Sequence, residues 1–320
     1  MAIIAGIDEA GLGPLLGPLV VSGTAFRVPD SRIHDCLWET LDETCTSSVS
    51  RDTRRLAVAD SKQLFRGRAS LAPLERAVLV TLAVNGCRPR TWRELLDHVA
   101  PSATEQLESY PWYAASDVAL PLSGDVGDVG TRANAILRNC RAKEVEPLGA
   151  FCEPLPEYHF NRLIESTNNK SVVLLGLALR VADRILRCGD DRRVRICVDR
   201  LGGRMRYREA LSTAFPDYDL QILEETPEHS AYRLTRESRV CRFEFTVKGE
   251  QHHFTVALAS AYSKYLRELY MHALNSYWSG QVAGLRPTAG YYTDAKRWLL
   301  DVEPALRRLA VKPSTLVRQR

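Results

Sequence analysis

The sequence has no long apolar run, and this absence excludes several classes of protein. Nowhere do about 18 or more apolar residues follow one another, so we expect no membrane-spanning helix and no membrane partner. No basic segment followed by an apolar one opens the sequence, so we expect no secretory signal peptide. These two absences favour a cytoplasmic location.

Motifs for several kinds of chemistry are missing as well. The eight cysteines are scattered, without a C-x-x-C pair or the cysteine–histidine spacing of zinc sites. Cys197 falls inside an apolar stretch, so we expect it to be a small core residue. There is neither a G-x-S-x-G motif nor a G-x-x-x-x-G-K-[ST] motif, which argues against a serine hydrolase and a nucleotide triphosphatase. No internal repeat or low-complexity tract is present.

An excess of charge of one sign is also lacking. Lys and Arg number 43 against 39 Asp and Glu, which gives a formal net charge of +4. A charge this mild is compatible with a nucleic-acid partner without indicating one. The 320 residues are 45% hydrophobic and 26% charged, as is typical of a globular protein with one large domain or two ordinary ones.

The N-terminal stretch joins an apolar strand to two adjacent acids. Residues 3–7 are apolar or glycine and predict a buried strand, which leads directly into Asp8 and Glu9. A turn with three glycines and two prolines follows, and a second strand is expected over about 19–26. Glycine lets a backbone come very close to a ligand. Two acids beside such a turn therefore suggest a cation bound next to a phosphate or a sugar.

Two more acids follow apolar segments further along the chain. Residues 193–199 alternate between apolar and polar side chains and end in Asp199. Residues 238–250 alternate in the same way and end at Glu250, before a long helix expected over about 254–274. A last helix is expected near 295–309. Strands mixed with helices in this order predict an α/β domain with a mixed sheet flanked by helices.

The four acids Asp8, Glu9, Asp199 and Glu250 form a candidate metal site. Converging carboxylates raise one another's pKa, and a divalent ion removes that repulsion. Ligand sets made only of oxygen favour Mg²⁺ or Mn²⁺ over zinc. Two such ions about 3.5–4 Å apart activate a water molecule and stabilise the leaving oxygen of a phosphodiester. Glu244 or Asp191 is an alternative to Glu250 as the fourth ligand.

Four motifs resemble those of the type 2 ribonucleases H, the ribonuclease HII family. Residues 6–18 match the family's G-x-D-E-A-G-R-G-P-x-x-G-P at every fixed position but one, where Leu12 replaces arginine. Residues 60–64 match D-S-K-x-L, residues 259–264 resemble the A-S-x-x-A-K helix, and residues 290–293 resemble G-Y-x-T. The matches occur in the family's order and span most of the chain.

The resemblance implies a ribonuclease H-like fold with a small helical C-terminal subdomain. Residues 1–275 would form the catalytic domain, with an insertion over about 88–142, and residues 276–320 the subdomain. Asp8, Glu9, Asp199 and Glu250 would be the metal ligands, with Glu250 in place of the family's aspartate. The implied substrate contacts come from the backbone of the first turn and from side chains near the acids: Gly11, Leu12, Gly13, Lys62, Ser260, Lys264 and Tyr291, with Tyr292 as a rival to Tyr291.

The function that the resemblance implies is a metal-dependent endonuclease of DNA replication and repair, with Mg²⁺ or Mn²⁺ as cofactor. It would hydrolyse the RNA strand of RNA–DNA hybrids, or cleave at ribonucleotides in duplex DNA, and leave 5′-phosphate and 3′-hydroxyl ends. The alternative is a protein that kept the fold and binds nucleic acid without efficient cleavage. Leu12 and Glu250 favour this alternative, whereas the other three acids favour the enzyme. We expect a monomer.

Overall fold

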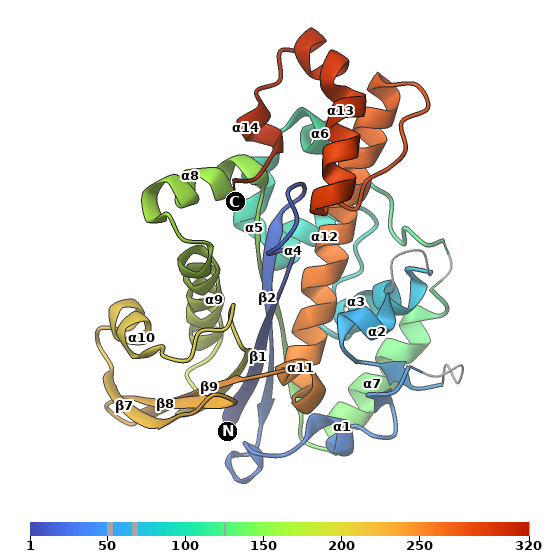
Figure 1. Cartoon of the computed structure of the whole chain (residues 1–320). Coiled ribbons are helices and arrows are strands. Elements are labelled where there is room, and N and C mark those ends of the chain that lie inside the picture. The colour runs from blue at the N-terminus through green and yellow to red at the C-terminus, as the bar shows by residue number, and fades with distance from the viewer. Residues whose placement is uncertain (50–53, 66–69, 125, 320) are drawn as a thin grey trace.

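A seven-stranded mixed sheet forms the centre of the molecule (Figure 1). The computed structural model describes residues 1–49, 54–65, 70–124 and 126–319. The strand order across the sheet is β5-β2-β1-β6-β9-β8-β7. The strands are β1 (Ala2–Ala10), β2 (Leu19–Val28), β5 (Glu146–Leu155), β6 (Arg193–Asp199), β7 (Asp219–Glu225), β8 (His229–Arg236) and β9 (Arg239–Thr246), and β3 (Cys45–Thr46) pairs with β4 (Leu56–Ala57) in a separate small sheet. The predicted α/β class with a mixed sheet is confirmed.

Three neighbouring strands of the sheet run parallel to one another. β6 lies between β1 and β9, with Ile7 opposite Val198 and Asp199 opposite Thr246. All other pairs in this sheet are antiparallel, including the predicted hairpin of β1 and β2. Because parallel strands end at the same edge of a sheet, the residues that follow β1, β6 and β9 meet there.

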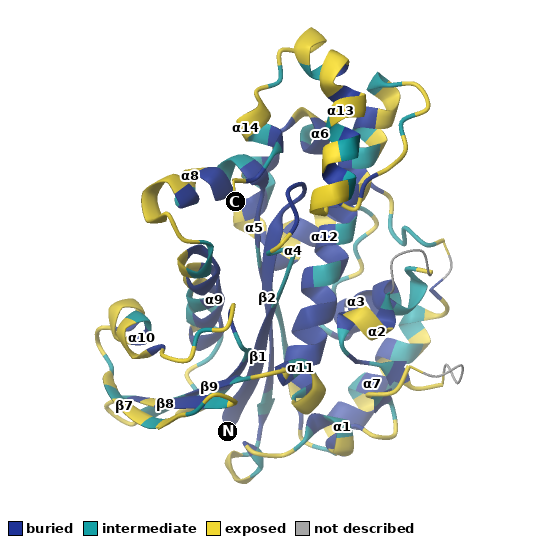
Figure 2. Ribbon diagram, viewed as in Figure 1, coloured by how far each residue is buried: buried dark blue, intermediate teal, exposed yellow. Residues whose placement is uncertain are grey.

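The two faces of the sheet are covered by two long helices. α12 (Phe254–Gln281) is buried over most of its length and packs on one face, as Figure 2 shows. α9 (Lys170–Arg187) packs on the other face, where the odd-numbered residues 3, 5 and 7 of β1 join its core. A Cβ on Gly6 would lie 2.3 Å from the backbone nitrogen of Val256. Glycine at this position therefore allows α12 to approach β1 closely.

Shorter helices surround these layers. On the α12 side they are η1 (Asp30–Arg32), α1 (Leu37–Thr40), α2 (Ser61–Leu64), α3 (Ala72–Val84), α4 (Trp92–Val99), α5 (Pro101–Leu107), α6 (Pro111–Ala114), α7 (Val129–Ala142) and α13 (Tyr292–Arg308), and the others are α8 (Glu157–Thr167), α10 (Arg208–Ala214), α11 (Gly249–His252) and α14 (Pro313–Leu316). In the described part of the chain, none of the helices has the length and apolar character needed to cross a membrane.

The segment 88–142 is more regular than its proline content indicates. Pro101 and Pro111 are the first residues of α5 and α6. Proline is tolerated there because the amide that it lacks would have no partner within the helix. Trp92 and Trp112 are fully buried and join this segment to the core around α12. That it is an insertion, and that a subdomain begins at 276, stay predictions; residue 275 lies inside α12.

One expectation about the sheet is wrong in detail. The alternating segment 238–250 is not a single strand, because β9 ends at Thr246 and Glu250 lies in the short helix α11. Val247 continues the apolar alternation but is 38% exposed. Lys248 then takes a left-handed backbone conformation with φ of 56°, which breaks the strand. β8 has no counterpart among the predicted strands.

Candidate functional site

The edge where β1, β6 and β9 end brings the predicted acids together. Oxygen atoms of Asp8, Glu9 and Asp199 all lie within 4.8 Å of one another. Glu250 joins them from α11, and its carboxyl group is hydrogen-bonded to that of Asp199. The backbone amide of Gly249 also donates to Asp199, at 2.8 Å, which fixes α11 against the end of β6. Residues up to 242 positions apart, Asp8 and Glu250, thus belong to one acidic cluster.

The two alternative ligands lie elsewhere. Glu244 accepts hydrogen bonds from Arg195 at 2.9 Å and forms an ion pair with Arg242 at 2.6 Å. Burial alone would raise the pKa of Glu244, but the attraction of Arg195 holds it below its usual value. Asp191 is held by Arg27, whose Nε lies 3.0 Å from Oδ2. Both carboxylates are therefore satisfied as ions without a metal.

The acids of the cluster, unlike Glu244 and Asp191, lie in surroundings that disfavour their charged forms. Burial, followed by the charges of Glu9 and Asp199, raises the pKa of Asp8 well above its ordinary value. Burial and Asp199 raise the pKa of Glu9 to about 7. The pKa of Asp199 is raised by burial, and that of Glu250 by burial and by Asp199. Removing these groups from water without a counterion disfavours their charged forms.

The donor set fits a hard divalent cation. Four carboxylates with no histidine or cysteine among them match the oxygen ligands of Mg²⁺ or Mn²⁺. In the described part of the chain, Oε2 of Glu9 is buried without a hydrogen-bond partner. Buried polar atoms are normally paired, so this oxygen, in a cluster of like charge, is suited to bind a cation.

Two serines of α12 support Asp8. Ser260 is hydrogen-bonded to the Asp8 carboxyl, which lowers the pKa of Asp8 and partly offsets the effect of burial. The hydroxyl oxygens of Ser260 and Ser61 also lie within hydrogen-bond distance of each other, at 3.0 Å. Ser263, fully buried, donates to the backbone oxygen of Asp8 at 2.9 Å. Ser260 was expected at the site; Ser263 was not, although it stands within the same A-S-x-x-A-K match.

The segment of α2 contributes one negative and one positive side chain at this edge, Asp60 and Lys62. Asp60 caps α2 by accepting the amide hydrogen of Lys62 at 2.9 Å. The positive charge of Lys62 lowers the pKa values of Glu9 and Asp199, which places it near the cluster. Asp60 itself raises the pKa of Glu250, so a fifth acid lies at the rim. Only the D-S-K match gave a hint of Asp60.

Lys264, in contrast, is directed to a different partner. Its ammonium group lies 2.6 Å from Glu268, one turn further along α12, and 5.5 Å from the centre of the Phe65 ring. Only about a fifth of each charged side chain is exposed. The predicted contact of Lys264 with a phosphate stays a prediction, and it requires Lys264 to leave or share Glu268.

The glycine-rich turn and the Gly290–Tyr291 segment lie against each other. The carbonyl oxygen of Gly290 accepts the amide hydrogens of Leu15 at 2.8 Å and of Leu16 at 3.3 Å. Tyr291, at the start of α13, is 55% exposed and has the guanidinium of Arg267 5.7 Å from its ring centre. Tyr292 is 39% exposed and faces Lys296 instead. Tyr291 is thus the aromatic residue linked to the turn.

A second group of potential metal ligands surrounds a carboxylate whose charge is already balanced by arginines. Atoms of Cys197, Glu244 and His253 lie within 4.8 Å of one another. Glu244 is paired with two arginines, and burial lowers the pKa of His253 to about 4. Cys197 is buried, as expected of a core residue, and burial raises the pKa of its thiol to about 12. A divalent ion would meet two guanidinium groups there, so this group does not form a competing metal centre.

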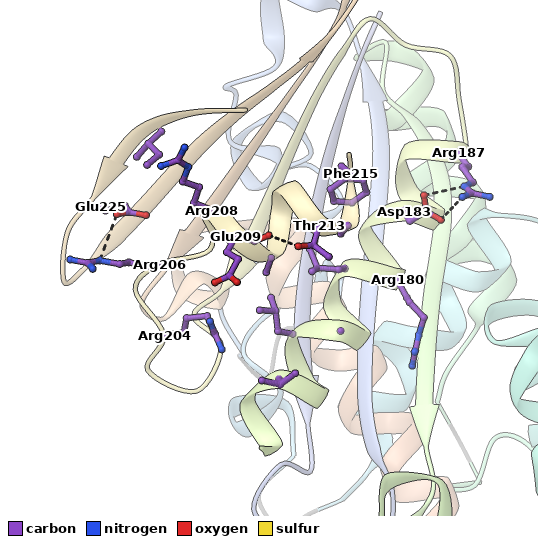
Figure 3. A pocket seen from close by; sticks show the side chains of 17 residues that line it. Arg180, Asp183, Arg187, Arg204, Arg206, Arg208, Glu209, Thr213, Phe215 and Glu225 are labelled. Atoms are coloured by element: carbon purple, nitrogen blue, oxygen red, sulfur yellow. Dashed lines mark hydrogen bonds and ion pairs between the residues drawn. The ribbon is translucent and has the colours of Figure 1, made fainter. Parts of the chain in front are cut away.

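A cavity of about 1050 Å³ lies on the α9 face between α9 and α10, away from the acidic cluster. Figure 3 shows that two of its acids are paired with arginines, Asp183 with Arg187 and Glu225 with Arg206. None of the four clustered acids lines it. The cavity therefore offers no site for the metal chemistry.

Comparisons with known proteins found similarities to ribonucleases HII and HIII. No family model matches the chain. It is 40% identical over 79 residues to a ribonuclease HII of Gluconobacter oxydans (strain 621H), a match that spans 23% of this chain and 36% of the relative's length. Among solved structures, the ribonuclease HII in a PCNA:RNase HII complex from Archaeoglobus fulgidus is 16% identical, with a TM-score of 0.47 and coverage of 99% of this chain and 94% of the other. Bst-RNase HIII in complex with Mn²⁺ is 15% identical, with a TM-score of 0.42 and coverage of 99% and 66%.

Proposed function

The chain is a distant member of the type 2 ribonuclease H family, and from this premise we propose that it is a divalent-metal-dependent endonuclease acting on RNA–DNA hybrids or on ribonucleotides within duplex DNA. The observation that carries the proposal is the convergence of Asp8, Glu9, Asp199 and Glu250 at one edge of the sheet. A protein that only binds nucleic acid has no use for a cluster of acids facing phosphates.

Asp8, Glu9, Asp199 and Glu250 are the residues that would hold Mg²⁺ or Mn²⁺. Bound divalent ions supply the activation of water and the stabilisation of the leaving 3′-oxygen in phosphodiester hydrolysis. The protein's own contribution is to position the acids. Ser260 and Ser263 hold Asp8 from α12, and the amide of Gly249 holds Asp199. Such support from neighbouring groups fixes the orientation of ligand carboxylates.

The substrate surface proposed beside the acids consists of the glycine-rich turn and Tyr291. Gly11 has a φ of 89°, and a Cβ there would lie 2.5 Å from the carbonyl oxygen of Pro18, so only glycine allows this turn. Among the residues that the structure describes, only Gly13 itself and its two chain neighbours have heavy atoms within 4 Å of the position that a Cβ on Gly13 would take. A sugar can therefore approach the backbone closely, and amides that reach a 2′-hydroxyl distinguish RNA from DNA. The exposed ring of Tyr291 offers a surface for stacking on a sugar.

A cleavage assay with a matched pair of variants tests the proposal. The substrates are a labelled RNA–DNA hybrid, a DNA duplex with one ribonucleotide, and an all-DNA duplex, each with Mg²⁺ or Mn²⁺. Asp8→Asn removes one charge of the cluster, and Asp191→Asn removes the charge of a carboxylate that serves Arg27 instead.

We expect cleavage of both ribonucleotide-containing substrates by the wild type, with 5′-phosphate and 3′-hydroxyl product ends. Asp8→Asn should lower the rate by about 10³-fold or more, because such a charge contributes several kcal/mol to the transition state. Asp191→Asn should stay within about threefold of the wild type. If the wild type cleaves with neither Mg²⁺ nor Mn²⁺, the proposal is contradicted and a protein that binds hybrids without cutting them is favoured. Full activity of Asp8→Asn would also contradict the proposal.

A further inference from the structure

Leu12 stands where type 2 ribonucleases H have an arginine, so the turn lacks a guanidinium on its outer side. A guanidinium reaches the same turn from its inner side. Arg318, only 2% exposed, donates from Nη1 to the carbonyl oxygen of Gly11 at 2.5 Å and from Nη2 to that of Leu12 at 2.7 Å. A third contact joins Nη1 to the carbonyl oxygen of Gly17 at 3.3 Å.

The segment that carries Arg318 is itself held in place. The backbone amide of Arg318 donates to Leu15 at 2.9 Å. Asn161 on α8 donates to the carbonyl oxygens of Ser314 and Val317 and accepts the amide hydrogen of Gln319. The ring of Phe160 lies 4.2 Å from the guanidinium carbon. These contacts fix both the backbone and the guanidinium group of Arg318 beside the turn.

Because peptide bonds are planar, the contacts of the two carbonyl oxygens also determine where the amide hydrogens of the turn point. In a trans peptide the C=O and the following N–H point in opposite directions. With the oxygens of Gly11 and Leu12 directed inward to Arg318, the amide hydrogens of Leu12 and Gly13 point outward. In the described part of the chain, neither of these amides has a protein acceptor. Gly13 is exposed, so its amide is accessible.

We propose that Arg318 is a positioning residue that orients the amides of Leu12 and Gly13 for recognition of a ribonucleotide's 2′-hydroxyl. The inference rests on the proposed function, because it assigns these amides to the substrate of that site. Charge-assisted hydrogen bonds from one guanidinium to two successive carbonyls fix both peptide planes at once. Lysine keeps the positive charge but lacks the planar pair of donor nitrogens, so it would fix the two peptide planes less firmly.

The test compares Arg318→Ala and Arg318→Lys with Arg239→Ala. Arg239 is a matched control, since it also donates to two backbone oxygens, those of Leu186 and Gly189, but far from the turn. Two quantities are measured: KM and kcat for the hybrid with Mg²⁺, and the binding ratio between a DNA duplex with one ribonucleotide and an all-DNA duplex, by fluorescence anisotropy in EDTA.

We expect Arg318→Ala to raise KM about tenfold and to lower the binding ratio by a similar factor, as for the loss of one or two oriented hydrogen bonds. Methylguanidinium added to Arg318→Ala should restore part of both. Arg318→Lys, which keeps the charge and should fold, should show the same losses to a smaller degree. Arg239→Ala should leave KM and the binding ratio unchanged, even where it lowers the folded fraction and hence kcat.

The outcomes separate the inference from the proposed function. A wild type that neither cleaves the hybrid nor prefers the ribonucleotide duplex contradicts the proposed function and the inference with it. A wild type that does both, together with Arg318 variants that lose only kcat, leaves the function standing and overturns the role of Arg318.

Discussion

Neutralising Asp8 should stabilise the metal-free protein while it strongly lowers activity. Asp8 is 6% exposed and lies within 4.8 Å of oxygen atoms of Glu9 and Asp199. Two full charges at that distance repel by about 3–4 kcal/mol at an effective dielectric constant near 20. Part of this repulsion is already relieved, because the pKa of Asp8 is raised by burial and by its acidic neighbours.

Asn keeps the shape of Asp and carries no charge, so we expect Asp8→Asn to gain about 1–3 kcal/mol in EDTA at pH 8. For a chain of 320 residues, a gain of about 2 kcal/mol raises Tm by about 3 °C. Thermal unfolding followed by circular dichroism measures this shift. Added Mg²⁺ should raise Tm of the wild type and have little effect on Asp8→Asn.

Asp191→Asn provides the opposite control. The Asp191 side chain is 7% exposed and accepts both bonds from Nε of Arg27. Removing its charge weakens these bonds and should lower the free energy of unfolding by about 1–3 kcal/mol. The reasoning is refuted if Asp8→Asn is less stable than the wild type in EDTA, or if the two variants shift Tm in the same direction.

Four further predictions concern stability, pH and specificity. The pKa of Glu9 is raised to about 7, so its protonated form stabilises the folded state; this stability is present below the ordinary pKa of 4.5 and is lost as pH rises through 7. The stability advantage of Glu9→Gln over the wild type in EDTA, measured by urea unfolding, should therefore grow from pH 5.5 to 8. A difference that stays constant with pH would contradict this prediction. Glu75, fully buried, accepts bonds from the amides of Leu122 and Ser123 and from Tyr265; Glu75→Ala should cost about 3 kcal/mol or more in urea unfolding, and a loss below about 1 kcal/mol would show that these donors find other partners. Gly6→Ala should lower Tm strongly by forcing α12 away from β1, at a cost of about 1–3 kcal/mol or more, and an unchanged Tm would contradict the close packing. Leu12→Arg should raise cleavage at a single ribonucleotide about tenfold by adding a phosphate contact, and an unchanged rate would remove the significance of that position.

The local part of the fold could be predicted because the patterns are local. Residues 3–7 and 193–199 are apolar or alternating, and they form β1 and β6. No strand was expected at β8 because its alternation is short: exposed Arg233 separates buried Tyr232 from buried Leu234, and the residues before them, Ser230 and Ala231, are small and do not alternate. The end of β9 was misplaced because the pattern continues to Val247, and the backbone turn at Lys248 leaves no apolar signature.

The acids of the candidate site could be predicted from local patterns, whereas the residues that support them could not. Asp8, Glu9 and Asp199 could be predicted because each stands beside a strand end in the sequence, and Glu250 followed from its distance to the α12 motif. The long-range supports could not be predicted. Ser263 reaches the backbone of Asp8 across 255 positions, and Arg318 reaches Gly11 across 307. No periodicity records such pairs, since they depend on how the packed elements meet.

The most direct test of the central claim is the position of bound metal. Crystals of the protein soaked in Mn²⁺ give an anomalous difference map that locates each ion independently of activity. We expect a peak about 2–2.3 Å from oxygens of Asp8, Glu9 and Asp199, and a second within reach of Asp199 and Glu250. Mn²⁺ bound only elsewhere, with the four carboxylates left without it, would contradict the account.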